Sequence, residues 1–244
     1  MSSHALARAV EILRDAPRLV VTTGAGMSKE SGIATFRDAP NALWANYDAQ
    51  ALATRAGFRR DPALVWRWYA DRRAMIAQAK PHEGHVALAQ WETFAQRFVI
   101  LTQNIDGLHV AAGSRNVVEL HGNIFRYKCF DRDHPAQEPF ATNETPPRCP
   151  CGSPLRPDVV WFGEMLNTAH LEAAHDAIAN CDVLLVVGTS GLVYPAAGFA
   201  AEAKVAGARV IEINPEPTPL SELADVFVAG GAKSILPALT GQIR

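Results

Sequence analysis

The sequence of 244 residues predicts an α/β fold, with a Rossmann-like, doubly wound parallel sheet and a smaller inserted lobe. Short apolar runs recur along the chain and alternate with helical patterns, which is typical of a parallel sheet with helices on both faces. Small or polar residues follow each run, and open α/β sheets bind ligands at the carboxyl ends of their strands. The chain is therefore expected to carry its site at one edge of this sheet.

The first expected elements are a helix at residues 5–14, with apolar side chains at helical spacing, and a strand at 19–23. Two later stretches break the alternation, a helical insertion at about 39–96 and a proline-rich, loop-rich stretch at about 127–158. We expect these two stretches to form the smaller lobe of a single domain. The larger lobe would comprise about 1–38, 97–126 and 159–244, with strands at 98–101, 182–187, 209–213 and 226–228 and a helix at 195–205.

Composition limits the class of protein. Hydrophobic residues make up 48% of the chain and charged residues 20%, so the chain can bury a full core. The 23 basic and 25 acidic residues nearly cancel, which leaves no general field to hold nucleic acid or an anionic membrane. No apolar stretch approaches the roughly 18 residues of a membrane span, and the N-terminus lacks a signal-peptide pattern. We expect a cytoplasmic monomer without nucleic-acid or membrane partners.

The segment of residues 24–37 leaves the first predicted strand and enters a turn. Gly24 and Gly26 would let the backbone approach a ligand closely, and the backbone N–H groups of a strand-turn-helix unit suit a pyrophosphate. The segment departs from the usual G-x-G-x-x-G fingerprint, because Lys29 stands where the third glycine would be. An ordinary strand-to-helix turn is the alternative interpretation.

Four ordered motifs resemble the sirtuins, which are NAD-dependent protein lysine deacylases. The motifs lie at 24–37, at Thr102–His109, at Leu120-His121-Gly122 and at Gly188-Thr189-Ser190, and the resemblance runs from about residue 18 to near the C-terminus. The segments 161–165 and 188–199 are more similar still to the bacterial CobB-type, class III branch. The resemblance implies NAD as a co-substrate and acyl-lysine proteins or peptides as substrates.

The resemblance implies an NAD site made of the loops that follow the strands. Two amides and a carboxylate, from Gln103, Asn104 and Asp106, suit a ribose and the nicotinamide carboxamide, although Asn and Asp are also frequent in turns. Phe36 and Arg37 would belong to a lid over the cofactor, with a core residue and a surface residue as the alternatives. The expected NAD contacts are Gly24, Ala25, Gly26, Ser28, Phe36, Arg37, Gln103, Asn104, Ile105, Asp106, Gly188, Thr189, Ser190, Asn214, Glu216 and Ala232.

In the implied reaction, the acyl-lysine carbonyl oxygen attacks the ribose carbon that bears nicotinamide, and the acyl group ends on ADP-ribose. The step needs a base near neutral pH, and imidazole has a reference pKa of about 6.5. His121 is the predicted base, with Asn104 and Asp106 completing the catalytic set. A structural role at a strand end is the alternative for His121, and spacing alone leaves His109 as a rival base. The alternative functions are a mono-ADP-ribosyltransferase and a non-catalytic NAD or ADP-ribose sensor.

The predicted substrate class rests on a helix that starts at Asp61-Pro62 and places Tyr69 and Arg72 on one face. This Tyr-x-x-Arg pair resembles the class III pattern, in which the two side chains bind a succinyl or malonyl carboxylate. A carboxylate drawn into an apolar tunnel must be paired, and a guanidinium offers it two donors. For Arg72 the alternative is an exposed helix residue. The expected substrate contacts also include the small Ala53 and, on an edge strand at 159–164 that would pair with the peptide, Val160, Trp161, Phe162 and Gly163.

Three of the four cysteines, Cys129, Cys149 and Cys151, are close in sequence and suit a metal in a reducing compartment. The zinc site of the sirtuins uses two Cys-x-x-Cys pairs, and tetrahedral zinc needs four ligands. Here Arg132 stands where the partner of Cys129 would be, and the second pair is shortened. Zinc is therefore a possible cofactor of this chain, with Asp131, Asp133 or His134 as the fourth ligand, or the site is vestigial.

Overall fold

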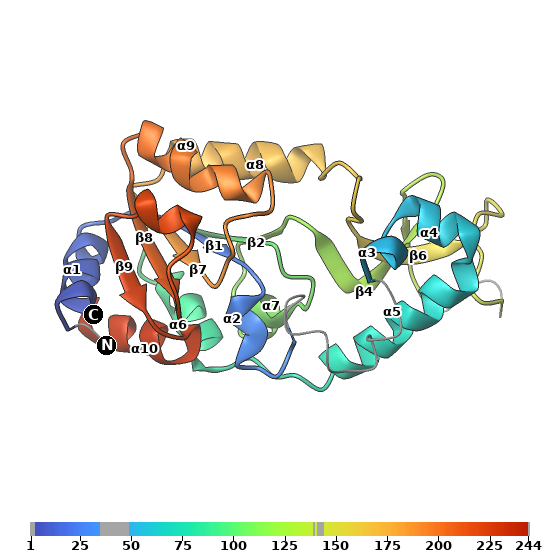
Figure 1. The fold of residues 1–244 in the computed structure, drawn as a ribbon, viewed down its shortest axis with the longest axis horizontal. Coiled ribbons are helices and arrows are strands. Elements are labelled where there is room, and N and C mark those ends of the chain that lie inside the picture. The colour runs from blue at the N-terminus through green and yellow to red at the C-terminus, as the bar shows by residue number, and fades with distance from the viewer. Residues whose placement is uncertain (1–2, 35–48, 139, 141–143, 244) are drawn as a thin grey trace.

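The computed structural model describes residues 3–34, 49–138, 140 and 144–243 (Figure 1). Its larger part contains a six-stranded sheet in the order β3-β2-β1-β7-β8-β9. Every neighbouring pair in this sheet is parallel, which confirms the predicted doubly wound fold. The strands are β1 (Arg18–Thr23), β2 (Arg97–Thr102), β3 (Val117–Glu119), β7 (Val183–Val187), β8 (Arg209–Asn214) and β9 (Val226–Ala229).

The strand order reverses between β1 and β7. The chain builds β1, β2 and β3 outward on one side, and then returns to place β7, β8 and β9 on the other side. In open α/β sheets the crevice at such a reversal lies outside the carboxyl ends of the strands and is the usual ligand site. The loops after β1 and β7 are therefore the first place to look for function.

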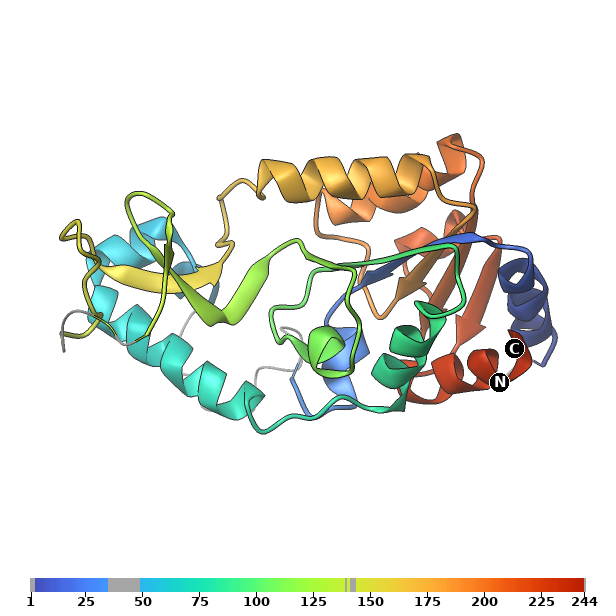
Figure 2. The ribbon, with the colours of Figure 1, turned by 180° about the vertical axis from the view of Figure 1, so that it is seen from behind.

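Both faces of the sheet are buried, because successive side chains of a strand point to opposite sides. On β1, Leu19 and Val21 pack in one core and Val20 packs in the other. Helices cover each face (Figures 1 and 2). One layer holds α1 (Ser3–Arg14), α6 (Glu83–Trp91) and α10 (Ala232–Ile243), and the other holds α8 (Thr168–Ala179), the 3-10 helix η2 (Ala196–Gly198) and α9 (Phe199–Val205). In the described part of the chain, no helix combines the length and apolarity of a membrane span.

The smaller part lies at the other end of the molecule, where α4, α5 and β6 are seen in Figure 1. A three-stranded antiparallel sheet has the order β5-β4-β6. Its core includes Phe58, Val65 and Trp161, which are all nearly fully buried. The elements are α3 (Ala49–Leu52), α4 (Arg55–Arg60), α5 (Pro62–Ile76), β4 (Gly122–Cys129), β5 (Pro135–Ala136) and β6 (Leu155–Val159), and the short helices α2 (Gly26–Lys29), α7 (Leu108–Ala111) and η3 (Pro219–Glu222) belong to the larger part.

Helix α6 lies within the helical insertion expected at 39–96, yet its apolar side chains pack on the larger sheet. Leu88 and Trp91 are fully buried in the core that includes β1 and α10. The Trp91 indole N–H also donates to Thr240 Oγ1 at 2.7 Å. The sequence pattern identifies an amphipathic helix but not the surface against which it packs, so the limit of the insertion could not be placed.

The edge strand expected at 159–164 is wrong, because β6 ends at Val159. The Val160 N–H still bonds in register to the residue before β4, but the N–H groups of Trp161 and Phe162 bond elsewhere. Val160 N donates to His121 O at 2.9 Å, and Phe162 N donates to Ala53 O at 2.9 Å. Trp161 N donates to the Glu164 carboxylate at 2.8 Å. The segment therefore ties the two parts of the molecule together with the donors that were expected to face a peptide.

Candidate active site

The turn after β1 and the turn after β7 interlock through their backbones. Gly24 N donates to Val187 O at 3.1 Å, and Gly26 N donates to Gly188 O at 2.8 Å. A Cβ on Gly26 would lie 2.7 Å from Gly188 O, and one on Gly188, where φ is +60°, would lie 2.4 Å from Met27 N. The sequence pattern predicts that these glycines admit a ligand. The structure gives them a further task, the contact between two loops at the switch point.

The loop after β2 joins the same network through its amide side chains. Asn104 Nδ2 donates to Gly24 O at 3.0 Å and to Ser28 Oγ at 3.1 Å. Gln103 Nε2 donates to Thr189 Oγ1 at 3.1 Å. Three loops that are far apart in sequence are therefore fixed against one another at the carboxyl edge of the sheet, as the strand order requires.

Asp106 lies at the start of α7 and is buried, with 7% of its surface exposed. Its Oδ1 accepts a hydrogen bond from Leu108 N at 2.9 Å. Burial raises the pKa of Asp106, while the hydrogen bonds from Leu108 N and the Ser28 hydroxyl work in the opposite direction. The carboxyl group is thus part of the same network as Asn104, since both contact Ser28.

His121 lies between β3 and β4, and its Nδ1 is 3.0 Å from Gln103 O. A carbonyl oxygen can only accept, so Nδ1 carries the proton and Nε2 is left as the basic nitrogen of a neutral ring. Burial lowers the pKa of His121, and the bond to the Gln103 carbonyl opposes that shift. The ring is therefore neutral near pH 7, the form in which an imidazole can take up a proton.

His109 has a different environment. It is 2% exposed, and its Nε2 lies 3.0 Å from Thr23 Oγ1. That hydroxyl donates to Thr102 Oγ1 at 2.9 Å, and Thr102 Oγ1 accepts from Asn104 N at 3.0 Å. Burial, with a smaller contribution from His82, lowers the pKa of His109 to about 3. Through Thr23 and Thr102, His109 thus stabilises the carboxyl ends of β1 and β2.

Two further buried histidines next to His109 were missed in the sequence. His85 is fully buried with its ring centroid 5.0 Å from that of His109, and the His82 ring lies tilted against His85 with the centroids 4.2 Å apart. The His82 Nε2 atom lies 2.7 Å from Met27 O, at the start of the motif segment. A His-x-x-His spacing at a helix start was the available signal, because it places both rings on one face.

The other residues expected to contact NAD differ in burial and in hydrogen bonding. Asn214 Nδ2 donates to Thr189 O at 3.0 Å and to the fully buried Glu212 at 2.9 Å, so it braces the loop after β7. Ala232 is buried at the start of α10. Ala25 and Glu216 are exposed, Ile105 and Ser190 are half-buried, and Phe36 and Arg37 lie outside the described residues.

At the small-lobe end, α5 begins as predicted, since Pro62 is its first residue and Asp61 caps it by accepting from Leu64 N at 2.8 Å. Tyr69 is 3% exposed, and its hydroxyl accepts from Trp161 Nε1 at 2.9 Å. Burial raises the pKa of Tyr69 to about 12, against the effect of the Arg72 charge. The phenol therefore stays protonated.

Arg72 follows Tyr69 on the same helix and is half-buried. Its guanidinium carbon lies 4.9 Å from the centroid of the Trp68 ring. Burial lowers the pKa of Arg72, and the neighbouring Tyr69 opposes this, but a guanidinium remains charged in either case. Ala53 and Trp161 belong to the same buried cluster as Tyr69, whereas Phe162 is 50% exposed and Gly163 is exposed beside it.

A possible metal centre lies in the loops beside the small sheet. One ligand atom each from Cys129, His134, Cys149 and Cys151 lies within 4.8 Å of the others. The loop turns back at Asp133, where φ is +54°, and Cys129 N donates to His134 O at 2.9 Å. Three thiols and one imidazole match the donor set and number of a tetrahedral zinc site. Of the three candidates for the fourth position, the fold brings His134 to the cysteines.

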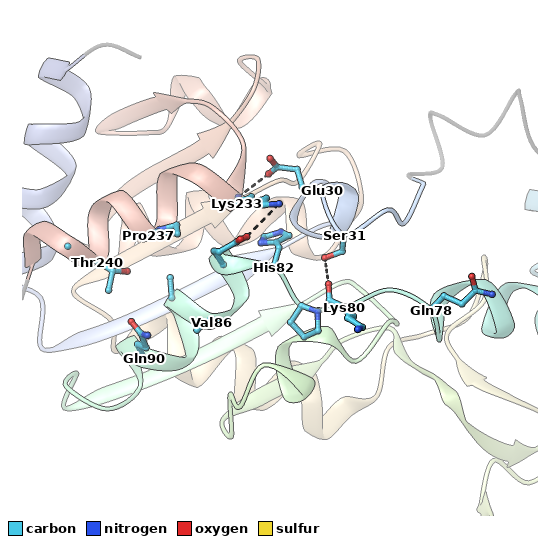
Figure 3. Close-up of a pocket in the computed structure, with 14 residues that line it drawn as sticks. Glu30, Ser31, Gln78, Lys80, His82, Val86, Gln90, Lys233, Pro237 and Thr240 are labelled. Atoms are coloured by element: carbon cyan, nitrogen blue, oxygen red, sulfur yellow. Dashed lines mark hydrogen bonds and ion pairs between the residues drawn. The ribbon is translucent and has the colours of Figure 1, made fainter.

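A separate open pocket of about 810 Å³ lies between α6, α10 and the turn after α2 (Figure 3). On its rim, the Lys233 backbone N–H donates to Glu30 Oε2 at 2.9 Å, and Lys233 Nζ lies 3.7 Å from Glu83 Oε2. None of the residues expected to contact NAD lines this pocket. It therefore does not coincide with the switch-point site.

The fold and this site define a class, namely doubly wound α/β proteins with a nucleotide site at the switch point and a neutral imidazole beside it. Comparison with known proteins narrows that class. Residues 24–195 match the Sir2 family. The chain belongs to the Sir2 family, which confirms the resemblance seen in the sequence.

Two relatives and one solved structure illustrate the similarity. The chain is 49% identical to NAD-dependent protein deacylase 2 of Pyrobaculum aerophilum, covering 96% of this chain and 94% of the relative. It is also 49% identical to the NAD-dependent protein deacylase of Ralstonia nicotianae, covering 92% and 91% of the two chains. A crystal structure of a Sir2 homologue in complex with NAD superposes with a TM-score of 0.90 at 40% identity, over 98% of this chain and 93% of the other.

Proposed function

We propose that this protein is an NAD-dependent protein lysine deacylase, which removes succinyl and malonyl groups as well as acetyl groups from lysine side chains. The acyl group passes to ADP-ribose, and nicotinamide is released. The observation that carries the proposal is the neutral His121 imidazole, bonded through Nδ1 to Gln103 O at 3.0 Å in the Sir2 sequence context. Relatives named NAD-dependent protein deacylases align with nearly the whole chain.

In this proposal NAD binds at the interlocked loops of the switch point. Asn104 and Gln103 already bridge those loops, so their carbonyl oxygens and the neighbouring backbone are held in place for a ribose and a carboxamide. Asp106 offers a buried carboxylate next to them. Residues positioned before the ligand arrives lose little conformational entropy when it binds.

His121 acts as the base in this proposal. Its Nε2 atom takes the proton from a ribose hydroxyl, and its Nδ1–H stays bonded to Gln103 O, which keeps the ring in the correct tautomer. His109 is assigned a supporting role, because its Nε2 is engaged with Thr23 Oγ1. The choice between the two histidines thus rests on their hydrogen-bond partners.

The acidic-acyl preference rests on Tyr69 and Arg72. A carboxylate at the end of a succinyl or malonyl chain would meet one fixed positive charge and one phenol that stays protonated. Ala53 and Trp161 pack in the same buried cluster as Tyr69. Acetyl-lysine has no group that uses this pair, so the pair has a clear purpose only for an acidic acyl chain.

For the metal centre we propose a zinc ion held by Cys129, Cys149, Cys151 and His134. Zinc would supply structural cross-linking there, since a site with four protein ligands has no open position for chemistry. Cys129 is the last residue of β4, His134 directly precedes β5, and Cys149 and Cys151 precede β6, so the ion would connect the three strands of the small sheet.

The function is tested by incubating the purified protein with NAD and matched acetyl-, malonyl- and succinyl-lysine peptides, and by measuring nicotinamide and free lysine peptide by mass spectrometry. We expect both products in equal amounts, and loss of both in His121→Ala while NAD binding by calorimetry persists. Nicotinamide release with transfer of ADP-ribose to protein would identify a mono-ADP-ribosyltransferase instead. NAD binding without nicotinamide release would identify a sensor.

A further inference from the structure

The Trp161 side chain has an unusually complete set of polar and charged contacts for a buried indole. Its N–H donates to the Tyr69 hydroxyl at 2.9 Å, and the two rings stack with centroids 6.3 Å apart. The Arg156 guanidinium carbon lies 3.3 Å from the indole centroid, a close cation–π contact. Trp161 is 2% exposed, so neither its hydrogen bond to Tyr69 nor its cation–π contact competes with bulk water.

Arg156 is itself held in place by hydrogen bonds. It is fully buried, and it donates to both Glu164 carboxylate oxygens, at 2.5 and 2.8 Å, and to Val159 O at 2.6 Å. Glu164 Oε2 also accepts from Trp161 N at 2.8 Å. Burial raises the pKa of Glu164, but its bonds to Arg156 and to Trp161 N outweigh this and lower it, so the pair is ionised. The backbone and the ring of Trp161 are thus held by the Arg156–Glu164 ion pair, which Arg55 joins through Glu164 Oε1 at 3.2 Å.

The direction of the Trp161–Tyr69 hydrogen bond decides what the phenol can do. An indole N–H only donates, so the Tyr69 oxygen must accept. Among the described residues, Trp161 is the hydrogen-bond partner of this hydroxyl. The hydroxyl proton must then point away from Trp161, and the neighbouring charged group on that helix face is Arg72, which cannot accept it. The Tyr69 O–H donor beside the Arg72 cation is therefore a site for an anion.

We propose that Trp161 is a positioning residue for acyl selectivity: by donating to the Tyr69 oxygen, it directs the Tyr69 proton toward the carboxylate of a bound acidic acyl chain. The Arg156–Glu164 pair holds Trp161 in that orientation. This inference rests on the proposed function and extends it, because it makes carboxylate recognition depend on a residue that does not touch the carboxylate. Acetyl-lysine has no carboxylate, so its turnover serves as the internal reference.

The test is a double-mutant cycle of Trp161→Phe and Tyr69→Phe, with kcat/KM measured for matched succinyl- and acetyl-lysine peptides. We expect the succinyl-to-acetyl ratio to fall roughly three- to tenfold in Trp161→Phe, the usual effect of one hydrogen bond. In Tyr69→Phe it should fall at least as far. The double variant should match Tyr69→Phe alone, because Trp161 acts through the phenol.

A ratio that is unchanged in Trp161→Phe, or effects that multiply in the double variant, would overturn the inference. If Trp161→Phe fails to fold, benzothienylalanine at position 161 replaces the N–H by sulfur within the same shape, and the same drop in ratio is expected. The proposed function is judged separately. A wild-type protein that leaves succinyl-lysine untouched refutes the acidic-acyl preference and this inference together, whereas a ratio that responds to Arg72→Met but not to Trp161→Phe refutes the inference alone.

Discussion

The two ends of this molecule are built from different kinds of contact. At the switch point, the turns after β1 and β7 contact each other through backbone atoms, as in the 2.8 Å bond between Gly26 N and Gly188 O. At the small-lobe end, charged and aromatic side chains hold the site, as in the fully buried Arg156 between Glu164 and Trp161. The contact between the two turns at the cofactor end therefore depends on the absence of side chains, whereas the acyl end depends on particular side chains.

This difference has a consequence for mutation. Where two backbones touch, any added Cβ collides, so a substitution damages the whole loop arrangement. Where side chains form the site, a conservative substitution can remove one interaction and leave the surroundings in place. Substitutions of the glycines between the two turns should affect folding and all substrates, whereas those at the acyl end should affect the choice between substrates.

The largest effect is expected for Gly188→Ala. Its φ is +60°, and a Cβ would lie 2.4 Å from Met27 N, so backbone strain and collision add. We expect a loss of at least about 3 kcal/mol in the free energy of unfolding, measured by urea titration. Gly207→Ala is the matched control, because φ is +87° but no atom lies within 4 Å of the added Cβ. It should cost only about 1–2 kcal/mol, and equal losses would contradict the interlocked-loop account.

A second contrast separates the two histidines of the cofactor end. His121→Ala should lower kcat by about 10²- to 10⁴-fold, the usual contribution of a general base, with little change in the unfolding free energy. His109→Ala should mainly destabilise the fold, by about 2 kcal/mol, since this residue is buried against Thr23. Single-turnover kinetics measure the rate loss in both variants, and urea titration measures their unfolding free energies. The assignment of the base fails if the rate loss follows His109.

The metal centre lies at the small-lobe end, where side chains hold the structure together. Loss of the metal should therefore disturb mainly its own surroundings. We expect His134→Ala to lose most of its zinc by elemental analysis and to unfold at lower temperature. Asp131→Ala is the control, because Asp131 is not among the four clustered ligands, and it should keep about one zinc per chain. Retention of zinc by His134→Ala with loss in Asp131→Ala would show that the ligand assignment is wrong.

The smallest effect concerns pH. Burial lowers the pKa of His121 below its ordinary value of 6.5, and a base is active in its deprotonated form. Deacylation should therefore persist as the pH falls through 6.5 and decline only at a lower pH, where the imidazole takes up a proton. The measurement is kcat/KM against pH with one peptide. An acid limb with its midpoint above 6.5 would contradict the described burial of this ring.

The sequence was most informative where function depends on the backbone. Gly24, Gly26 and Gly188 occur in short motifs, because only glycine fits the contact and its position is fixed by the ends of the strands. The doubly wound sheet could be predicted for the same reason. The start of α5 was also predictable, because capping by Asp61 and Pro62 is a local matter.

The features of the fold and the site that could not be predicted from the sequence depend on long-range packing. The three-residue strand β3 is too short for a periodic signal, and the fact that α6 packs on the larger sheet follows from tertiary contacts. Sequence spacing left three candidates for the fourth metal ligand, and only the turn at Asp133 brings His134 to the cysteines. Likewise, no motif joins Trp161 to Tyr69, which are 92 positions apart.

The most direct test of the account is the choice between acyl groups, measured as NAD-dependent kcat/KM for matched succinyl- and acetyl-lysine peptides in the wild type, Arg72→Met and Arg67→Met. Arg67 lies on the same helix but is exposed, which makes it the matched control. We predict that Arg72→Met lowers the succinyl-to-acetyl ratio by about tenfold or more, the effect of losing a charged hydrogen-bond partner, while Arg67→Met leaves it at the wild-type value. Equal loss of both activities in Arg72→Met would mean that Arg72 is structural, and would contradict the assignment of an acidic acyl group to this site.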